Sequence, residues 1–295
     1  MAPITPPALG YPEIVIERRL VIVSGKGGVG KSAVAAAIAI AAQRAGKRVL
    51  AMSMVGTGGG LASHFGEGAI GFEPREIQPG LHALAIDRSK ALIEYLKVQA
   101  GVPALATFGP IARAFDALAS AAPAIREIVT MGKALWEVRR GEWDLVVADG
   151  PPTGQIGSFI RAPKSITELV EAGRIQEQAA WMQGLLSDRE ASELVLVTVP
   201  EELPTSETLE TIEWLEREQV MGRRTVVANR VLPELAVGTL PDGKAGDAAR
   251  LHLSLAADQA VWLGNLPSDI RLPFLFGVRT ATEVASLLAD AMEPR

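Results

Sequence analysis

Residues 24–32 read SGKGGVGKS, and this short stretch decides how the rest of the chain is interpreted. It follows the apolar run RLVIVS and precedes a helical pattern that begins at Lys31. Gly25, Gly30, Lys31 and Ser32 fit the pattern G-x-x-x-x-G-K-[ST] between a strand and a helix, which is the context that this motif requires. The glycines let successive backbone N–H groups turn towards phosphate oxygens, and the helix start adds positive field. The stretch therefore predicts a phosphate-binding loop.

The two lysines of this loop have different expected positions. Lys31 is expected to reach the β- and γ-phosphates of a nucleotide, and Ser32 is expected to bind Mg²⁺. Lys26 is a second cation that one nucleotide does not need, and it either contacts another molecule or faces solvent as an ordinary loop lysine. The residues that we predict to bind the nucleotide here are Gly25, Lys26, Gly27, Gly28, Val29, Gly30, Lys31 and Ser32.

Apolar runs and helical patterns alternate along the chain. The runs that we interpret as strands lie at 19–24, 47–54, 80–86, 144–149, 193–199, 224–231 and 260–266. Helical patterns separate them, for example at 204–218 and 281–292. Near-continuous apolar strands that alternate with helices indicate a parallel sheet covered on both faces. The fold class that we predict is therefore α/β, with a doubly wound, mostly parallel sheet and helices on both faces.

The pattern predicts one domain with one interruption. Residues 1–19 are proline-rich and are expected to form an extended lead-in, and 20–295 are expected to form a single domain. Between about 87 and 143 no strand pattern appears, and three helical stretches follow one another. We expect this segment to be a helical insertion beside the sheet.

Composition excludes several classes of site. The chain has 295 residues and no cysteine, so disulfides, thiolate zinc sites and iron–sulfur clusters within it are excluded. Its formal net charge of −5 argues against nucleic-acid binding. The N-terminal stretch lacks the apolar core of a signal peptide, and the longest apolar run, at 33–42, is short for a membrane span. We expect a cytoplasmic protein that binds no nucleic acid.

Four further stretches carry polar residues at the expected edge of the sheet. WDLVVADGPPTGQ (143–155) ends a strand at Asp149, where a carboxylate can hold Mg²⁺ through water. The others are VTVPEELPTSETLETIEWL at 197–215, VVANRVLPE at 226–234 and LPFLFGVRT at 272–280. Acids at a helix start are favoured by the helix dipole alone, so Glu201 and Glu207 are assigned no chemistry.

Together with KGGVGKS, these stretches resemble the ArsA-type ATPases, which drive arsenite pumps or target tail-anchored proteins. The segment from Pro163 to Glu202 also resembles short ArsA-like proteins of actinobacteria, which occur as paired paralogues. The likeness covers most of the chain. It departs from the family pattern D-T-A-P-T-G-H after Asp149, where this chain reads DGPPTGQ.

The resemblance implies ATP and Mg²⁺ as cofactors and a dimer, either with itself or with a paralogous ArsA-like ATPase. In such a dimer Lys26 crosses the interface and touches the partner's nucleotide, as an arginine finger does elsewhere. The implied catalytic residues are Lys26, Lys31 and Asp149, and the implied metal ligands are Ser32 and Asp149. Asn229 would read the adenine edge, although it is also a common turn former at a strand end. Pro273 would lie in the loop that closes over the base.

After the second strand, ArsA-type ATPases carry an S-T-D-P-A-H-like segment whose acid activates the attacking water. The corresponding stretch of this chain, 53–68, lacks that acid. No Asp or Glu lies between Ser53 and Phe65, and the family's acid falls at about Val55 or Gly56, depending on register. General-base help typically contributes about 10²–10⁴-fold to a rate. We therefore expect slow hydrolysis, or a chain that is the hydrolysis-deficient half of a heterodimer. His64 and Glu67 are the candidate substitutes.

Two questions of function stay open, the role of the apolar helices and the class of ATPase. The apolar helices of the insertion, around 100–123, either pack on the sheet, which we favour, or form a groove for a membrane protein or hydrophobic client. The absence of cysteine makes arsenite an unsuitable ligand. The alternative class is a MinD- or ParA-like positioning ATPase that attaches to a surface, which requires a basic helix or face.

Overall fold

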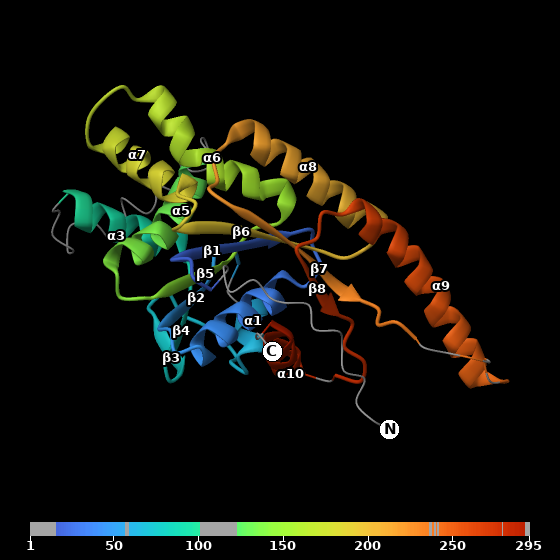
Figure 1. The fold of residues 1–295 in the computed structure, drawn as a ribbon. Coiled ribbons are helices and arrows are strands. Elements are labelled where there is room, and N and C mark those ends of the chain that lie inside the picture. The colour runs from blue at the N-terminus through green and yellow to red at the C-terminus, as the bar shows by residue number, and fades with distance from the viewer. Residues whose placement is uncertain are drawn as a thin grey trace.

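The computed structural model describes residues 16–56, 59–100, 123–235, 238, 240, 242–278 and 280–292 (Figure 1). Its strands are β1 (Leu20–Gly25), β2 (Val49–Ser53), β3 (Arg75–Gln78), β4 (Leu81–Ala85), β5 (Leu145–Asp149), β6 (Ser192–Thr198), β7 (Arg224–Val231) and β8 (Ile270–Pro273). Its helices are α1 (Lys31–Arg44), α2 (Gly59–His64), α3 (Arg88–Ala100), α5 (Pro123–Arg140), α6 (Thr153–Leu169), α7 (Arg174–Ser187), α8 (Glu202–Glu218), α9 (Lys244–Asn265) and α10 (Ala281–Met292).

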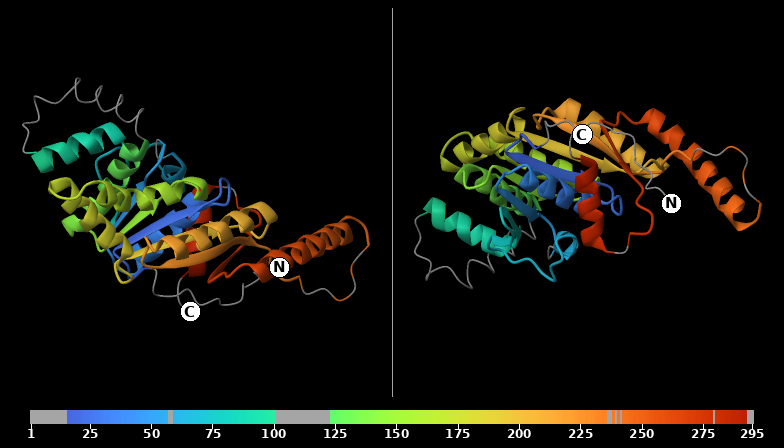
Figure 2. Two further views of the ribbon diagram at one scale, coloured as in Figure 1. Left: turned by 90° about the horizontal axis from the view of Figure 1, so that it is seen from above. Right: turned by 60° about the horizontal axis from the view of Figure 1, so that its bottom comes forward.

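The strands of the described residues form one eight-stranded sheet in the order β3-β4-β2-β5-β1-β6-β7-β8. Neighbouring strands are parallel, except that β3 pairs antiparallel with β4 at the edge. Helices α1 and α10 cover one face, and α5, α6, α7 and α8 cover the other (Figures 1 and 2). The predicted α/β class, with a doubly wound and mostly parallel sheet, is confirmed.

Strand β1 shows why the central sheet is apolar throughout. Val21 and Val23 pack with α1 and α10 in one core, whereas Leu20 and Ile22 pack with α5 and α6 in the other. All four side chains are fully buried because successive residues of a strand point to opposite faces. A buried side chain of this size contributes about 1.5–3 kcal/mol. The two cores therefore hold the middle of the sheet, and with it the loop that follows β1, in a fixed position.

The strand predicted at 260–266 is wrong. Residues up to Asn265 are the last turns of α9, a helix of 22 residues that extends away from the sheet (Figure 1). A short apolar run cannot by itself be assigned to strand or helix, and no turn residue separates this one from the helical pattern before it. The edge strand on this side is β8, which the sequence pattern missed. The strand β3 was missed as well, because REIQ is polar and mostly exposed.

The predicted insertion is described at its two ends, by α3 and α5, while residues 101–122 lie outside the described part. Met131, Leu135 and Val138 of α5 are buried in the core between the sheet and helices α5, α6, α7 and α8. This helix therefore belongs to the layer that covers the sheet. Of the predicted lead-in, residues 1–15 lie outside the described part. None of the described helices is long and apolar enough to cross a membrane.

Candidate nucleotide-binding site

The candidate site lies at the carboxyl edge of the central strands. Strand β1 ends at Gly25, and α1 begins at Lys31, so the glycine-rich stretch forms the connection between them. On the neighbouring strands, Asp149 is paired in register with Ser53 of β2 and with Val23 of β1. Parallel pairing thus brings the end of β5 to the mouth of the loop.

Ser32 and Asp149 meet directly. The Ser32 hydroxyl donates a hydrogen bond of 2.7 Å to Asp149 Oδ2. Burial raises the pKa of Asp149, and the Ser32 hydrogen bond together with the charges of Lys31 and His64 opposes this shift. A buried carboxylate beside a hydroxyl offers the hard oxygen ligands that Mg²⁺ takes, and a cation would relieve the cost of the buried charge. The predicted metal ligands therefore fit a magnesium ion.

Lys31 is folded back over its own loop. Its Nζ donates to the Lys26 carbonyl oxygen at 3.1 Å. Burial lowers the pKa of Lys31, and the negative charge of Asp149 opposes that shift. A partly desolvated ammonium group over a glycine-rich loop is suited to bind phosphate. Lys31 and Ser32 of the loop motif and Asp149 of the second stretch are thus brought together.

The loop backbone depends on glycine at particular points. Gly30 has φ of 96°, in the left-handed region, and a Cβ added there would lie 2.5 Å from Asn229 Nδ2. The buried Asn229 amide donates to the Val29 carbonyl at 2.8 Å and accepts from the backbone N–H of Arg230 at 2.9 Å. Asn229 therefore supports the loop from β7, and its predicted contact with adenine stays a prediction.

Gly30→Ala and Asn229→Ala are expected to be strongly coupled. Asn229→Ala should lower the free energy of unfolding by about 1–3 kcal/mol, because it leaves the carbonyl of the buried Val29 without its hydrogen-bond donor. Gly30→Ala should cost about 1–3 kcal/mol from the left-handed backbone alone, in addition to the clash with the amide. In the double variant the clash is absent, so its loss should be smaller than the sum by about 0.5–3 kcal/mol. Urea unfolding of all four proteins measures this cycle, and strict additivity would show that the two residues do not touch.

Lys26 occupies a different environment from Lys31. Its Nζ forms an ion pair with Glu207 Oε1 of α8. The other carboxylate oxygen, Glu207 Oε2, accepts a hydrogen bond of 2.9 Å from the Thr153 hydroxyl at the start of α6. The Lys26 and Glu207 side chains are 32% and 35% exposed, so the pair is open to solvent. The sequence pattern assigns Glu207 no chemistry. Lys26 and Glu207 are 181 positions apart, so no local sequence pattern could have indicated their contact.

A cavity of about 320 Å³ adjoins the phosphate loop beside Lys31 and Asp149. The residues that line it are Lys31, Ser32, Ser53, Val55, Gly56, Gly59, Gly60, Asp149, Gly150 and Pro152. Asp149 is the acid among these lining residues. The segment around Val55 thus brings no second carboxylate to this part of the described structure.

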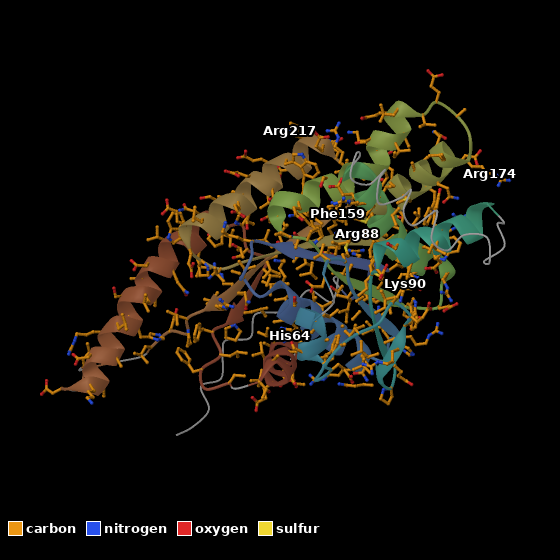
Figure 3. The ribbon with its side chains drawn as sticks, turned by 180° about the vertical axis from the view of Figure 1, so that it is seen from behind. His64, Arg88, Lys90, Phe159, Arg174 and Arg217 are labelled. Atoms are coloured by element: carbon orange, nitrogen blue, oxygen red, sulfur yellow. The ribbon has the colours of Figure 1, made fainter. Side chains whose placement is uncertain are left out.

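The two candidate substitutes for the missing acid have other partners. His64 ends α2 beside α10, and its Nδ1 lies 2.9 Å from the Ala281 carbonyl (Figure 3). Glu67 accepts a hydrogen bond of 2.6 Å from Arg75 at the exposed edge of the sheet. Neither residue lines the cavity beside Lys31. In this conformation they do not replace a general base at the phosphate loop.

Pro273 lies at the end of β8, where it is in register with Val231 of β7. This is the same edge of the sheet as the phosphate loop, but at its last strand. The exposed rings of Phe274 and Phe276 follow it, with centroids 4.8 Å apart. The contact of Pro273 with the nucleotide base therefore stays a prediction.

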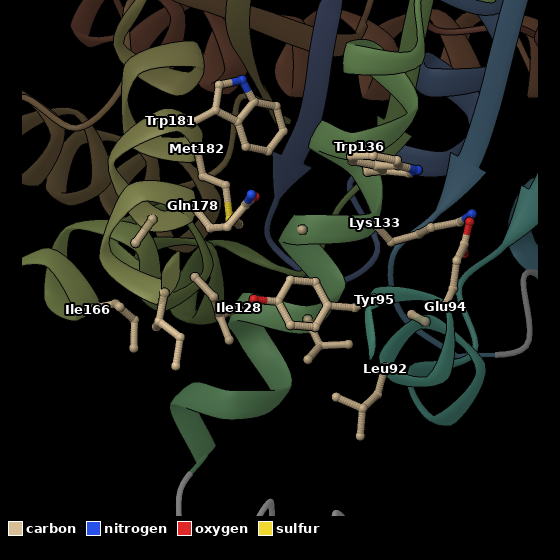
Figure 4. Close-up of a pocket in the computed structure, with 15 residues that line it drawn as sticks. Leu92, Glu94, Tyr95, Ile128, Lys133, Trp136, Ile166, Gln178, Trp181 and Met182 are labelled. Atoms are coloured by element: carbon tan, nitrogen blue, oxygen red, sulfur yellow. The ribbon is translucent and has the colours of Figure 1, made fainter. Parts of the chain in front are cut away.

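A second cavity, of about 240 Å³, lies between α3, α5, α6 and α7 (Figure 4). Its walls are mostly apolar and include Tyr95, Ile128, Trp136, Trp181 and Met182. The charged groups at one end, Lys133 and Glu94, are paired at 2.7 Å. The cavity therefore presents mainly apolar surface, and the charges of Lys133 and Glu94 neutralise each other.

A glycine loop between β1 and α1, with a lysine above it and a serine–aspartate pair at its end, defines a nucleotide-binding protein of the P-loop class. The family model for the anion-transporting ATPases, ArsA_ATPase, matches residues 18–183. The chain therefore belongs to this family, as the resemblance of its motifs predicted. Membership makes it a nucleotide-binding ATPase, and it favours this class over a MinD- or ParA-like positioning protein.

Curated relatives agree with the family. The chain is 33% identical over 241 residues to "ATPase BagA" of Mycobacterium tuberculosis, covering 77% of this chain and 69% of that protein. It is 27% identical over 239 residues to a "Putative arsenical pump-driving ATPase" of Halobacterium salinarum, covering 75% of this chain and 36% of the relative. It is 24% identical over 257 residues to "ATPase GET3" of Phaeosphaeria nodorum, covering 72% of this chain and 77% of that protein.

Proposed function

We propose that the chain binds Mg·ATP at its glycine loop and acts as a dimeric, nucleotide-driven switch in which Lys26 serves the partner's nucleotide. The observation that carries the proposal is the separation of the two loop lysines. Lys31 lies over the loop beside Asp149, whereas the Lys26 side chain points to α8 and is one-third exposed. One nucleotide is thus served by Lys31, and Lys26 is available to a second molecule.

The residues of one protomer have separate tasks in this proposal. The loop N–H groups and Lys31 hold the phosphates, and Ser32 and Asp149 would hold Mg²⁺. The metal ion, when bound, supplies charge that neutralises the phosphate oxygens. Lys26 of the partner adds positive charge where negative charge accumulates during phosphoryl transfer. Asn229 keeps the loop in the shape that these contacts need.

We further propose that hydrolysis by the chain is slow. The support is the cavity beside Lys31, which has Asp149 as its acid, together with the other contacts of His64 and Glu67. The chain is then either a slow homodimer or the hydrolysis-deficient half of a heterodimer with a paralogous ArsA-type ATPase. Brisk Mg²⁺-dependent turnover by the purified single chain would overturn this part of the proposal.

The dimer is tested by light scattering of the purified chain with Mg²⁺ and a non-hydrolysable ATP analogue. We expect the mass to double with the analogue, and Lys26→Ala to weaken the dimer at least tenfold, because a charge-assisted contact to phosphate is lost in each site. Binding of the analogue to the protomer should change little. The matched control is Lys90→Ala, an exposed lysine of α3 (Figure 3). A Lys26→Ala dimer as strong as the Lys90→Ala dimer would contradict the proposal.

A hydrophobic client and a cytoplasmic location remain our proposals. The apolar cavity between α3, α5, α6 and α7 supports the first, since it offers aromatic walls to an apolar side chain or segment (Figure 4). The segment around 100–123, which we expected to pack on the sheet and named only as the alternative site for a client groove, lies almost entirely outside the described residues. Hydrophobic-dye fluorescence measured with and without ATP analogue tests the client proposal, and a signal that ignores the nucleotide would count against it.

A further inference from the structure

Three side chains from separate parts of the chain meet beside the phosphate loop. Lys26 comes from the loop itself, Glu207 from α8, and Thr153 from the first turn of α6. Glu207 binds both of the others, with one carboxylate oxygen to Lys26 and the other to the Thr153 hydroxyl. Both oxygens of the carboxylate thus have a partner in the protomer, and Glu207 joins the loop to the segment that follows Asp149.

That segment is fastened at several points. The Gly150 N–H donates to the Val23 carbonyl at 2.8 Å, and the Ser24 hydroxyl donates to the Pro151 carbonyl at 2.7 Å. The Thr153 side chain, 8% exposed, then reaches Glu207. Thr153 lies four residues after Asp149, a predicted metal ligand. A change at Glu207 therefore acts on the segment that connects Thr153 to Asp149.

Lys26 cannot keep this ion pair and also serve another protomer's phosphates, because both uses need the same ammonium group. The two partners differ in strength. A triphosphate carries several negative charges, whereas Glu207 carries one, and a pair that is one-third exposed is weakened by solvent. The Lys26–Glu207 pair is therefore strong enough to orient a flexible lysine and weak enough to be displaced by nucleotide.

We propose that Glu207 is a positioning residue that holds Lys26 within its own protomer and releases it to the nucleotide of the partner. The proposal rests on the proposed dimer, in which Lys26 acts across the interface. After release, the Glu207 carboxylate keeps its hydrogen bond to Thr153 and gains a free oxygen. The nucleotide state of one protomer is thereby communicated to the segment after Asp149 in the other.

Other charged groups lie near the pair. The residues that line the cavity beside it, of about 430 Å³, include Lys26, Glu201, Glu202 and Arg230. The hydrogen bond from Lys26 lowers the pKa of Glu207, with burial opposing it and the Thr153 bond and the Lys26 charge adding to it. The pKa of Glu207 is therefore a direct readout of whether Lys26 is paired with it.

The first experiment follows the Glu207 carboxyl by carbon-13 NMR in the nucleotide-free protomer. We expect a pKa below the ordinary value in the wild type and a return towards that value in Lys26→Gln. Lys90→Gln, which removes an exposed lysine of α3, should leave the Glu207 titration unchanged. A Glu207 pKa that ignores Lys26→Gln would overturn the ion pair, whatever the oligomeric state of the chain.

The second experiment measures dimer formation with Mg²⁺ and a non-hydrolysable ATP analogue by sedimentation. Glu207→Gln should lower the protein concentration at half-dimerisation by roughly twofold to twentyfold, because two exposed ion pairs no longer have to be broken. The matched control is Glu213→Gln, an exposed residue further along the same helix, which should behave as the wild type. Addition of the analogue should also raise the pKa of Glu207 in the wild type as Lys26 leaves.

The outcomes separate the two proposals. A wild-type chain that stays monomeric with the analogue overturns the dimer and, with it, the release of Lys26 to a partner. A wild type that dimerises while Glu207→Gln dimerises equally or less well overturns the positioning role alone. Stronger dimerisation of Glu207→Gln, with Glu213→Gln unchanged, supports both.

Discussion

The Lys31→Ala variant is expected to lose ATP turnover by about a hundredfold to a thousandfold, which is the usual effect of removing one donor from a charged transition state. The physical reason is the position of the ammonium group, which lies over the loop backbone and beside Asp149. Its partial burial means that water cannot take its place at the phosphates with equal strength. Turnover measured by phosphate release, and binding measured by calorimetry, should both fall.

The matched control for Lys31→Ala is Lys90→Ala, which removes an exposed lysine of α3 and should leave turnover unchanged. Circular dichroism would establish that both variants are folded. Calorimetric binding of Mg·ATP to Lys31→Ala with wild-type affinity would contradict the assignment of the loop as the nucleotide site.

Gly25→Ala is expected to lower the free energy of unfolding by about 3 kcal/mol or more, through overpacking and backbone strain together. A Cβ at this position would lie 2.0 Å from the Val197 carbonyl oxygen, and the backbone φ is 153°. Neither backbone can move aside easily, because Gly25 and Val197 are paired in the centre of the sheet. Urea unfolding followed by tryptophan fluorescence measures the loss.

Gly27→Ala is the control, two residues further along the same loop. An added Cβ there has no atom within 4 Å, and its φ is not in the left-handed region. The free energy of unfolding should therefore change by no more than about 0.5 kcal/mol. Equal losses for the two variants would show that general loop flexibility, and not the contact with Val197, makes glycine necessary at Gly25.

Much of the sheet could be predicted from sequence because its strands are buried on both faces. Strands such as β1 and β5 are continuous apolar runs, and the parallel sheet needs no other signal to be recognised. The same logic failed at the edges. The polar edge strand β3 has no apolar run, and the apolar end of α9 imitates a strand.

The site was predictable where a motif fixes the backbone, and not where the fold brings distant residues together. The positions of Lys31 and Ser32 follow from the loop pattern, and Asp149 follows from the end of a buried strand. The contacts of Asn229 with Val29 and of Glu207 with Lys26 join residues 200 and 181 positions apart. Such contacts depend on which strands and helices become neighbours, and local sequence does not contain that information.

The most direct test of the central claim mixes two defective variants of the chain. Lys26→Ala keeps its own Lys31, and Lys31→Ala keeps the Lys26 that the first variant lacks. If Lys26 acts on the partner's nucleotide, a mixed dimer contains one complete site of its two, so an equal mixture should restore between about a quarter of the wild-type turnover, if pairing is random, and about half, if only mixed pairs form. Each variant alone should be nearly inactive. The wild-type chain, measured alone or with its paralogous partner, sets the reference turnover, and a mixture no more active than the two variants measured separately under the same conditions would contradict the account.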